Sequence, residues 1–478
     1  MDKINFISQS TSITIVIIIS LIFTFVGLIY SKKYQGINNY LTANREIGFV
    51  SLSTSLVASA LGAWILFGPA SAATWGGIGA VIGYALGTSF PMIFLIFLGK
   101  KIRNEFPRGS TLIEFLRKRF GKSLFKLILS MTIFYMFVFL CAEVTAVAIL
   151  INYISGTELW ITALITLTAT LIYTLYGGLR ASIFTDTIQM IVILVLILIS
   201  TFYLISFAGN EFSFSFIKEK NPHLLSSNYI PNYTAGITFF IAVAATNLFH
   251  QGNWQRVYAA KNNDILKKSL ILSFIIIIPI VLFMGISGLV AVSVNPNVVP
   301  DLAFFSILLK DQTQFLSLII VILGLSLTIS TVDTLVNAIS SLIVVDGKAT
   351  FKSTLSKDYL KISKYFIIFL SIIAFIIASK GFSILYLFLL ADLFCCAFVM
   401  TVFYSFYNKK ISEKTAYISI TVGLIGGFLL FPVPDFSKSL LVGVMLPIDL
   451  FPALVSQSLL FLSFLIATFV PVVIWKLR

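Results

Sequence analysis

Thirteen apolar stretches run through this chain, and most of them are long enough to cross a lipid bilayer as an α-helix. Such a helix needs about 20 apolar residues to span a hydrocarbon core of roughly 30 Å. Hydrophobic residues make up 58% of the sequence and charged residues only 11%, which is unlike an ordinary soluble domain. We therefore predict an all-α, polytopic membrane protein with spans at 11–30, 48–72, 78–99, 124–150, 159–177, 186–207, 235–252, 269–293, 315–345, 360–379, 381–404, 415–432 and 453–475.

Lys and Arg are concentrated in every second gap between these stretches. With the N-terminus outside, six of the 33 basic residues fall in outer gaps and the other 27, Arg256 among them, fall in inner gaps. The positive-inside rule then favours 13 transmembrane helices, with the N-terminus outside and the C-terminus inside. The six outer residues are Lys3, Lys218, Lys220, Lys310, Lys380 and Lys438.

The net charge of +14 does not indicate nucleic-acid binding, because the basic residues lie next to the membrane, where they face anionic lipids. Cys141, Cys395 and Cys396 all lie in apolar stretches and form no metal-binding motif. We expect neither a disulfide framework nor a cofactor. The first stretch is followed by Lys32 and Lys33, and we predict that it stays as an anchor rather than being cleaved.

Two of the predicted helices contain residues that favour a break inside the membrane. Small residues at 58–63 precede Gly68-Pro69 in the second stretch, and polar residues at 246–256 surround Gly252 in the seventh. Non-helical backbone at that depth has to line a cavity or be buried in protein. The breaks lie five spans apart, so the second block has inverted topology, as in inverted-repeat transporters. For the second stretch alone, close helix packing through small residues explains the pattern equally well.

The ninth stretch carries the densest polar cluster, at 328–334. On a helix Leu327, Ser330 and Asp333 share one face, and Thr331 adjoins it. Hydroxyl and carbonyl oxygens of this kind suit a small hard cation that has lost its hydration shell. Hydrogen bonds between helices are the alternative explanation for the hydroxyl groups. Asp333 favours an ion or solute path, because an unpaired carboxylate inside a bilayer is unfavourable.

Three further acidic residues lie within or at the ends of apolar stretches. Glu143 has few polar neighbours in sequence, which favours a role in a cavity over a hydrogen bond between helices. Asp186 follows Thr185 and is also explained by a helix N-terminus. Asp392 could equally line a path or pair with a polar neighbour.

Several motifs resemble the sodium:solute symporter family, which includes sodium/proline, sodium/sugar and sodium/sialic acid carriers. Residues 176–189 (YGGLRASIFTDTIQ) resemble its signature, while 255–261 (QRVYAAK) and Ser330-Thr331 match two further family stretches. Residues 107–115, 119–121 and 142–145 look closest to the urea and polyamine branch. The resemblance covers nearly the whole chain. Ala60 departs from it, since sodium/proline carriers have an Asp there.

This resemblance implies a LeuT-type core of two inverted five-helix repeats. Its segments would be 1–47 (an extra helix and the first inner loop), 48–207 (first repeat), 208–234 (outer loop), 235–404 (second repeat) and 405–478 (two further helices). Carried over by position, a sodium site would use the carbonyl groups of Ala58, Leu61 and Leu327 and the hydroxyl groups of Ser330 and Thr331. In the family, an acid at the position of Asp186 belongs to the cation path or a second ion site.

We therefore expect a secondary transporter, not an enzyme, that couples Na⁺ to a small urea-, polyamine- or amino-acid-like solute by alternating access. The predicted solute site comprises Trp64, Glu143, Asn247, His250 and Asp333. Proton coupling is the alternative within the same fold. A channel or a membrane-embedded hydrolase is disfavoured, because no pore repeat or catalytic motif is present. We expect a bacterial inner membrane location and no obligatory protein partner.

Overall fold

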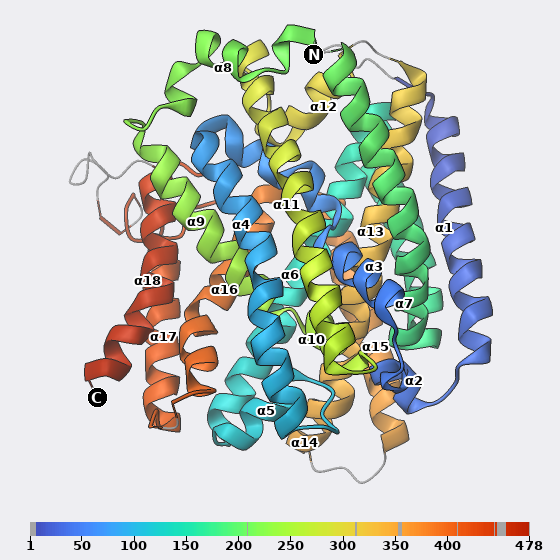
Figure 1. Ribbon diagram of the computed structural model, residues 1–478, viewed down its shortest axis with the longest axis vertical. Coiled ribbons are helices and arrows are strands. Elements are labelled where there is room, and N and C mark those ends of the chain that lie inside the picture. The colour runs from blue at the N-terminus through green and yellow to red at the C-terminus, as the bar shows by residue number, and fades with distance from the viewer. Residues whose placement is uncertain are drawn as a thin grey trace.

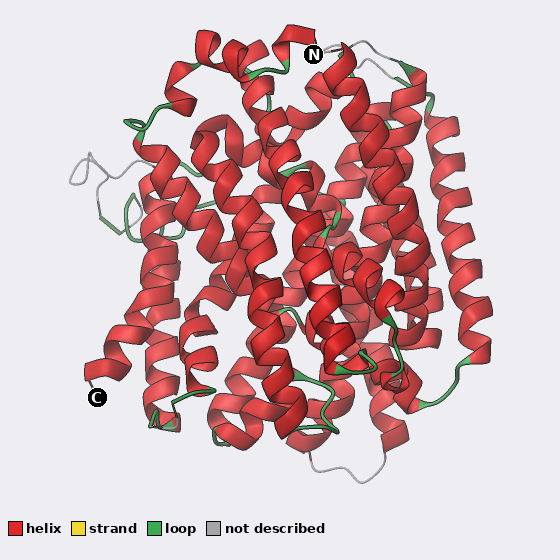
Figure 2. Cartoon of the chain, viewed as in Figure 1, coloured by secondary structure: helices red, strands yellow, loops and turns green. Residues whose placement is uncertain are grey.

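The computed structural model describes residues 6–207, 209–310, 313–351, 356–408, 410–443, 445–446 and 456–477. Within these ranges the chain is entirely helical apart from loops and isolated bridges (Figures 1 and 2). Eleven of the described helices are long and apolar enough to cross a membrane. This confirms the predicted all-α, polytopic architecture. Lys3 and residues 453–455 of the last predicted span lie outside the described residues.

The eleven long helices are joined by shorter ones that cap or interrupt them. The long helices are α1 (Gln9–Lys33), α4 (Gly68–Glu105), α6 (Lys122–Ser155), α7 (Leu159–Phe207), α9 (Ile230–Phe249), α11 (Asn263–Val294), α13 (Gln314–Leu342), α15 (Ser356–Ala378), α16 (Ile384–Ser405), α17 (Glu413–Leu430) and α18 (Ser456–Leu477). The shorter elements are α2 (Ile37–Thr42), η1 (Ala43–Arg45), α3 (Phe49–Ala60), η2 (Ala63–Leu66), α5 (Leu112–Arg119), η3 (Gly209–Glu211), α8 (Phe214–Lys220), η4 (Pro222–Leu225), α10 (Gln251–Ala259), η5 (Pro300–Leu302), α12 (Ala303–Leu308), η6 (Ile343–Gly347) and α14 (Lys348–Phe351).

Helices α4 and α7 each leave helical geometry at one glycine. Gly77 has φ 59° and ψ −157°, and Gly178 has φ 62° and ψ −154°. A continuous helix with the 49 residues of α7 would be about 74 Å long, more than twice the hydrocarbon core. Each of these helices therefore comprises two segments. Those of α7 overlap the predicted spans 159–177 and 186–207, and those of α4 overlap the end of the span 48–72 and the span 78–99. The total of thirteen crossings stays a prediction.

Both predicted helix breaks are present. Helix α3 ends at Ala60, and Leu61 and Gly62 are non-helical before η2 begins. Helix α9 ends at Phe249, and α10 resumes after His250, which has φ −58° and ψ 107°. The second break therefore lies at His250 and not at Gly252.

Gly252 has a packing role. A Cβ atom there would lie 2.5 Å from Cγ2 of Thr334 and 2.8 Å from Cε1 of His250. The residue is a glycine because α10 and the neighbouring α13 approach each other closely, not because the helix breaks there.

Glycine also brings α4 into close contact with α9 and α11. A Cβ atom on Gly79 would lie 1.7 Å from the carbonyl oxygen of Asn232, and one on Gly83 would lie 2.2 Å from that of Gly236. On the other side, a Cβ atom on Gly288 would lie 2.1 Å from the carbonyl oxygen of Ala70. Such backbone-to-backbone packing is typical of helices in membranes, where apolar lipid supplies little drive for association.

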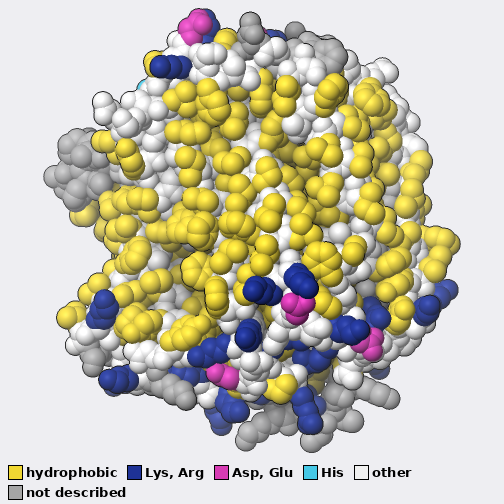
Figure 3. Space-filling model, viewed as in Figure 1, with side chains coloured by type: hydrophobic (Ala, Val, Ile, Leu, Met, Phe, Trp, Pro, Cys, Tyr) yellow, Lys and Arg dark blue, Asp and Glu magenta, His cyan; other side chains and the backbone are white. Residues whose placement is uncertain are grey.

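Charge divides the surface along the long axis. Lys and Arg gather at one end, near α5, and a wide hydrophobic band covers the middle of the face shown (Figures 1 and 3). We call this end the basic end. The band has the character expected of a surface in contact with lipid tails.

We predict that Gly178→Ala destabilises the protein more than Gly209→Ala. Both glycines have positive φ, at 62° and 53°, which costs an L-residue about 1–2 kcal/mol. A Cβ atom at Gly178 would also lie 2.5 Å from the ring of Tyr40, whereas one at Gly209 has no neighbour within 4 Å. Thermal unfolding of the purified variants in detergent measures the difference, and equal Tm values would contradict the prediction.

Candidate functional site

A small cavity lies where the two broken helices meet α6, α13 and α16. Its volume is about 30 Å³. Polar side chains, aromatic rings and one carboxylate line it. These residues are Ser59, Ala60, Trp64, Tyr84, Phe139, Val243, Thr246, Asn247, His250, Thr331, Phe388 and Asp392.

Three of the predicted solute residues line this cavity. Trp64 stacks on Tyr84 with the ring centroids 5.7 Å apart. Asn247 donates to the carbonyl oxygen of Val243 at 2.9 Å, one turn earlier in α9. The Nδ1 atom of His250 is buried without a hydrogen-bond partner among the described residues. The cavity thus combines aromatic surface with unused hydrogen-bonding capacity.

Glu143 lies at the break between α3 and η2, beside the cavity, and is not one of the residues that line the cavity. Its Oε2 atom accepts a hydrogen bond from the backbone N–H of Ala63 at 2.8 Å. The carboxylate therefore faces the N-terminal end of η2, where backbone N–H groups lack helical partners. A Cβ atom on Gly62 would lie 2.2 Å from Oε1 of Glu143, so only glycine fits between them. The buried Oε1 has no hydrogen-bond partner in the described part of the chain.

Asp333 lies outside the cavity, between α13 and α7. Its Oδ2 atom accepts hydrogen bonds from the hydroxyl groups of Tyr173 at 2.6 Å and Thr185 at 3.2 Å. Its Oδ1 atom accepts from Ser182 at 2.8 Å. Both oxygens are thus satisfied by α7, and the contact fixes α13 against that helix.

Asp186 is fully buried and pairs with Arg256, with 2.7 Å between Oδ2 and Nη2 and side-chain exposures of 0% for both. Oδ2 of Asp186 also accepts from Ser55 at 2.6 Å, and Oδ1 accepts from Ser330 at 2.6 Å. We predict from the sequence that the inner basic residues face anionic lipids. Arg256 does not, because α10 is buried along its whole length.

The guanidinium of Arg256 also holds the two breaks together. Nε donates to the hydroxyl and the carbonyl oxygen of Ser55 at 2.7 and 3.1 Å, and Nη1 donates to the carbonyl oxygen of Gly252 at 3.0 Å. Nη2 donates to the hydroxyl of Thr334 at 2.9 Å. One side chain therefore connects α3, α7, α10 and α13.

Side chains and backbone of the predicted sodium site lie next to this network. Helix α3 ends at Ala60, so carbonyl groups of its last turn lack the N–H partners of a continuing helix. The hydroxyl of Thr331 donates to the carbonyl oxygen of Leu327 at 3.0 Å, and a Cβ atom on Gly62 would lie 2.8 Å from that hydroxyl. The structure thus brings the last turn of α3, with Ala58, and the break at Leu61 to the Ser330-Thr331 face of α13.

Sequence reasoning did not assign Asp392 or three of the aromatic residues to this cavity. Asp392 does pair with a polar neighbour, since it accepts from the hydroxyl of Thr246 at 2.6 Å, and it also lines the cavity. Its position within an apolar stretch was the available signal. Tyr84, Phe139 and Phe388 carry no such signal, because aromatic residues are frequent in every span.

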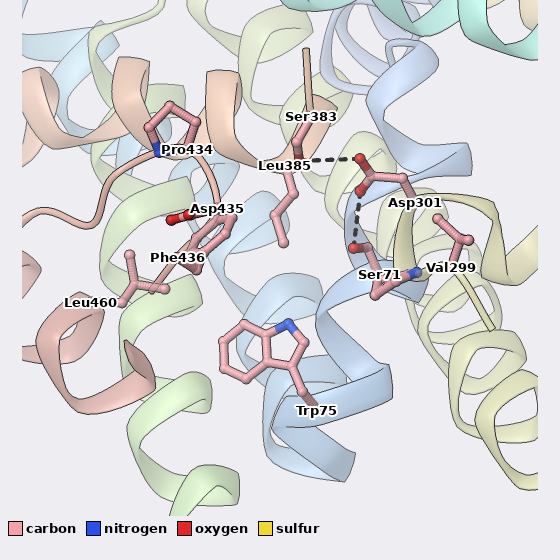
Figure 4. A pocket seen from close by; sticks show the side chains of 11 residues that line it. Ser71, Trp75, Val299, Asp301, Ser383, Leu385, Pro434, Asp435, Phe436 and Leu460 are labelled. Atoms are coloured by element: carbon pink, nitrogen blue, oxygen red, sulfur yellow. Dashed lines mark hydrogen bonds between the residues drawn. The ribbon is translucent and has the colours of Figure 1, made fainter. Parts of the chain in front are cut away.

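A larger cavity, of about 350 Å³, lies in the half of the molecule opposite the basic end, next to η5 and α12 (Figure 1), and Figure 4 shows the residues that line it. Asp301 accepts from the hydroxyl groups of Ser71 and Ser383 at 3.1 Å each, and from the backbone N–H of Ile384 at 3.2 Å. Burial raises the pKa of Asp301, and these hydrogen bonds lower it less. Asp301 thereby joins η5, α4 and the start of α16.

A row of aromatic rings connects the two cavities. Trp75, which lines the larger cavity, lies 5.7 Å from Phe239, and Phe239 stacks on Tyr84 at 4.6 Å. Tyr84 in turn stacks on Trp64 in the smaller cavity.

We predict that the single substitutions Asp186→Asn and Arg256→Gln each lower stability by about 3–5 kcal/mol, because each leaves a buried charge unpaired. The double variant should lose clearly less than the sum of the two. Thermal unfolding of the four proteins forms a double-mutant cycle. Lys268→Gln, which breaks the exposed pair with Asp264, is the control and should change stability by at most about 1 kcal/mol. Additive effects at Asp186 and Arg256 would contradict the prediction.

Residues 40–423 match the model of the sodium:solute symporter family. The chain is 28% identical over 382 residues to a spermidine transporter of Candida albicans, covering 79% of this chain and 71% of that protein. It is 30% identical over 214 residues to sodium/glucose cotransporter 1 of Mus musculus, covering 43% of this chain but only 30% of that protein. The spermidine transporter agrees with the resemblance to the polyamine branch.

Two solved structures share the fold. A Na⁺-coupled sialic acid symporter in a substrate-bound, outward-open state superposes with a TM-score of 0.71 and 16% identity, covering 96% of this chain and 97% of that one. Mhp1, a nucleobase-cation-symport-1 family transporter in a closed conformation, gives 0.57 and 14%, covering 93% and 96%. The fold is therefore that of the LeuT-type transporters. The chain is a multi-pass membrane protein that belongs to the sodium:solute symporter family, a family of transporters and not of enzymes.

Proposed function

We propose that this protein is a sodium-coupled symporter of a small cationic amine. The observation that carries this proposal is the lining of the central cavity: one carboxylate, Asp392, with aromatic rings and no Lys or Arg. A carboxylate attracts an ammonium group, and the faces of Trp64 and Tyr84 attract it further through their π electrons. The similarity to a spermidine transporter supports the same class of solute.

An anionic solute fits this lining less well. With no cation among the lining residues, a carboxylate bound there would face Asp392 without compensation. The sialic acid symporter shares the fold at 16% identity, which leaves room for a different solute site. A neutral solute such as urea would leave the charge of Asp392 without a counter-ion.

The cavity has to widen before it can hold such a solute. At about 30 Å³ it is far smaller than a typical ligand pocket of roughly 300–1,000 Å³. Movement of η2, α4 and α9 away from α6 and α16 would carry Trp64 and Tyr84 away from Phe139 and Phe388 and open the cavity. The contacts of Asp301, which join α4 to α16 in the half opposite the basic end, would then separate. These are the changes that alternating access requires.

We place the coupling ion where the break in α3 meets α13. Its ligands would be the carbonyl oxygens of Ala58, Leu61 and Leu327 and the hydroxyl oxygens of Ser330 and Thr331. Asp186, bonded to Ser330, would stabilise the cation electrostatically. The ion would order the break and so couple its own binding to the shape of the adjacent cavity. Glu143 and Asp333 then support the site by fixing the break and α13, and do not contact the solute.

The topology belongs to the same proposal. Thirteen crossings place the N-terminus outside and the basic end inside, with repeats at 48–207 and 235–404 between the flanking segments 1–47 and 405–478. A bacterial inner membrane, with its negative interior, would draw both the sodium ion and the amine inward by about 2.3 kcal/mol per charge per 100 mV.

We predict that Thr331→Val raises the Na⁺ concentration for half-maximal uptake by roughly tenfold or more. The substitution removes the contact between the hydroxyl oxygen and the sodium ion, and a hydrogen bond to a charged group is worth about 1.5–3 kcal/mol. Folding should be preserved, because this hydroxyl donates only to Leu327 in its own helix. Thr328→Val, an equally buried substitution in α13, is the matched control. An unchanged Na⁺ dependence in Thr331→Val would contradict the site.

We predict that proteoliposomes accumulate labelled spermidine or putrescine under an inward Na⁺ gradient, but not urea or proline. Asp392→Asn should raise the KM for the amine roughly tenfold to a hundredfold, because it removes a buried charge partner. Asp264→Asn, at an exposed acid, should leave uptake unchanged.

Three outcomes would contradict this proposal. Uptake of urea or proline alone would change the class of solute. Amine uptake driven by a proton gradient without Na⁺ would change the coupling ion. An unaltered KM in Asp392→Asn would remove the carboxylate from the solute site.

A further inference from the structure

A third cavity, which we call the hollow, lies at the basic end and is lined by three cations and no acid. Its volume is about 350 Å³, and it lies between the end of α4, η1 and the turn from α10 to α11. The cations are Arg45, Arg103 and Lys261. The remaining lining residues are Asn104, Pro107, Asn262 and Asn263, so the neutral part of the wall is rich in amides.

The two guanidinium groups are held in place. Nη2 of Arg45 donates to the carbonyl oxygen of Gly109 at 2.6 Å, and Nη1 of Arg103 donates to that of Val257 at 2.6 Å. Arg45 also lies 5.4 Å from the ring of Tyr258. Each guanidinium has five N–H donors, so most of them stay available. Arg45 and Arg103 are close enough to repel each other.

The acidic residues near this hollow are engaged elsewhere. Glu114 accepts from the backbone N–H groups of Ser110 and Thr111 in the capping box of α5. The other three form ion pairs outside the hollow: Glu46 with Arg180, Glu105 with Lys101 and Asp264 with Lys268. Among the described residues none of the three cations forms an ion pair, although Glu114 lies close enough to Arg45 to attract it.

We propose that this hollow binds the phosphate group of an anionic phospholipid headgroup. Guanidinium groups match the oxygens of a phosphate in pairs, and an ammonium group adds a third charge. The start of α11 also borders the hollow, but Asn262 already caps the N–H of Ile265 and Asp264 lies in the first turn, so the three cations carry the site. A basic pocket between helix ends at the inner side of a membrane suits a lipid headgroup.

A phosphate in this position would join three segments that meet at the basic end. The backbone N–H of Ile47 donates to the carbonyl oxygen of Ala259 at 3.0 Å, and that of Lys261 donates to Ile47 at 3.0 Å, so the chain before α3 already contacts the α10–α11 turn here. An anion bridging Arg45, Arg103 and Lys261 would strengthen this contact. It would thereby stabilise the arrangement in which α3 is closed against α10.

The test is the thermal unfolding of the full-length protein in a neutral detergent, with three additives and three proteins. The additives are dihexanoyl phosphatidylglycerol, dihexanoyl phosphatidylcholine and inorganic phosphate. The proteins are the parent, Lys261→Glu and Lys267→Glu. Lys267 is exposed and lies in the first turns of α11 outside the hollow, so its variant is a matched change of charge.

We expect phosphatidylglycerol to raise the Tm of the parent and of Lys267→Glu with a saturable dose dependence, and to raise that of Lys261→Glu much less. Phosphatidylcholine should have little effect on all three. If inorganic phosphate raises the Tm of the parent but not that of Lys261→Glu, the hollow binds phosphate, but its ligand is the free ion and not a lipid. No rise with either anion, or the same rise in all three proteins, would overturn the proposal. Lys261→Gln replaces Lys261→Glu if the charge reversal prevents folding.

Discussion

The buried ion pair between Arg256 and Asp186 is the contact on which the centre of this molecule depends. Taking two charges out of water is unfavourable unless every donor and acceptor finds a partner. Here the partners come from segments that are far apart in sequence, at Ser55, Gly252, Ser330 and Thr334. Satisfying one guanidinium and one carboxylate therefore fixes the relative positions of both broken helices and of α13.

In the function proposed above, that arrangement places the ion site and the solute site side by side. The break in α3 presents free backbone groups in two directions. Its carbonyl end faces α13, where Ser330 and Thr331 lie, and its N–H end faces Glu143. Trp64, which follows the break, lines the central cavity together with Asp392 of α16. A change in the geometry of a few residues around Gly62 therefore alters both sites together.

The membrane architecture could be predicted from the sequence because lipid imposes length and polarity on every crossing. The positions of the apolar stretches and of the break after α3 follow from the order of the residues, whereas the second break lies at His250 and not at Gly252. What could not be predicted was the environment of individual polar residues. In the sequence Arg256 looks like one more basic residue after a span, and only the folded chain shows that α10 is buried along its whole length. Asp333 and Glu143 read as free carboxylates, but their partners, Tyr173, Ser182 and the N–H of Ala63, lie many residues away.

The glycine joints in α4 and α7 have a consequence for anyone who handles the protein. At Gly77 and at Gly178 two helical segments are joined without an intervening loop. The side chain of Asn232 fills the space beside Gly77, and the ring of Tyr40 fills the space beside Gly178. A protease needs several residues of extended, accessible chain, and an inserted peptide tag needs an exposed loop tip. We therefore expect limited digestion not to cut at either joint and tags inserted there not to be tolerated. In such experiments each pair of segments behaves as a single uncut unit.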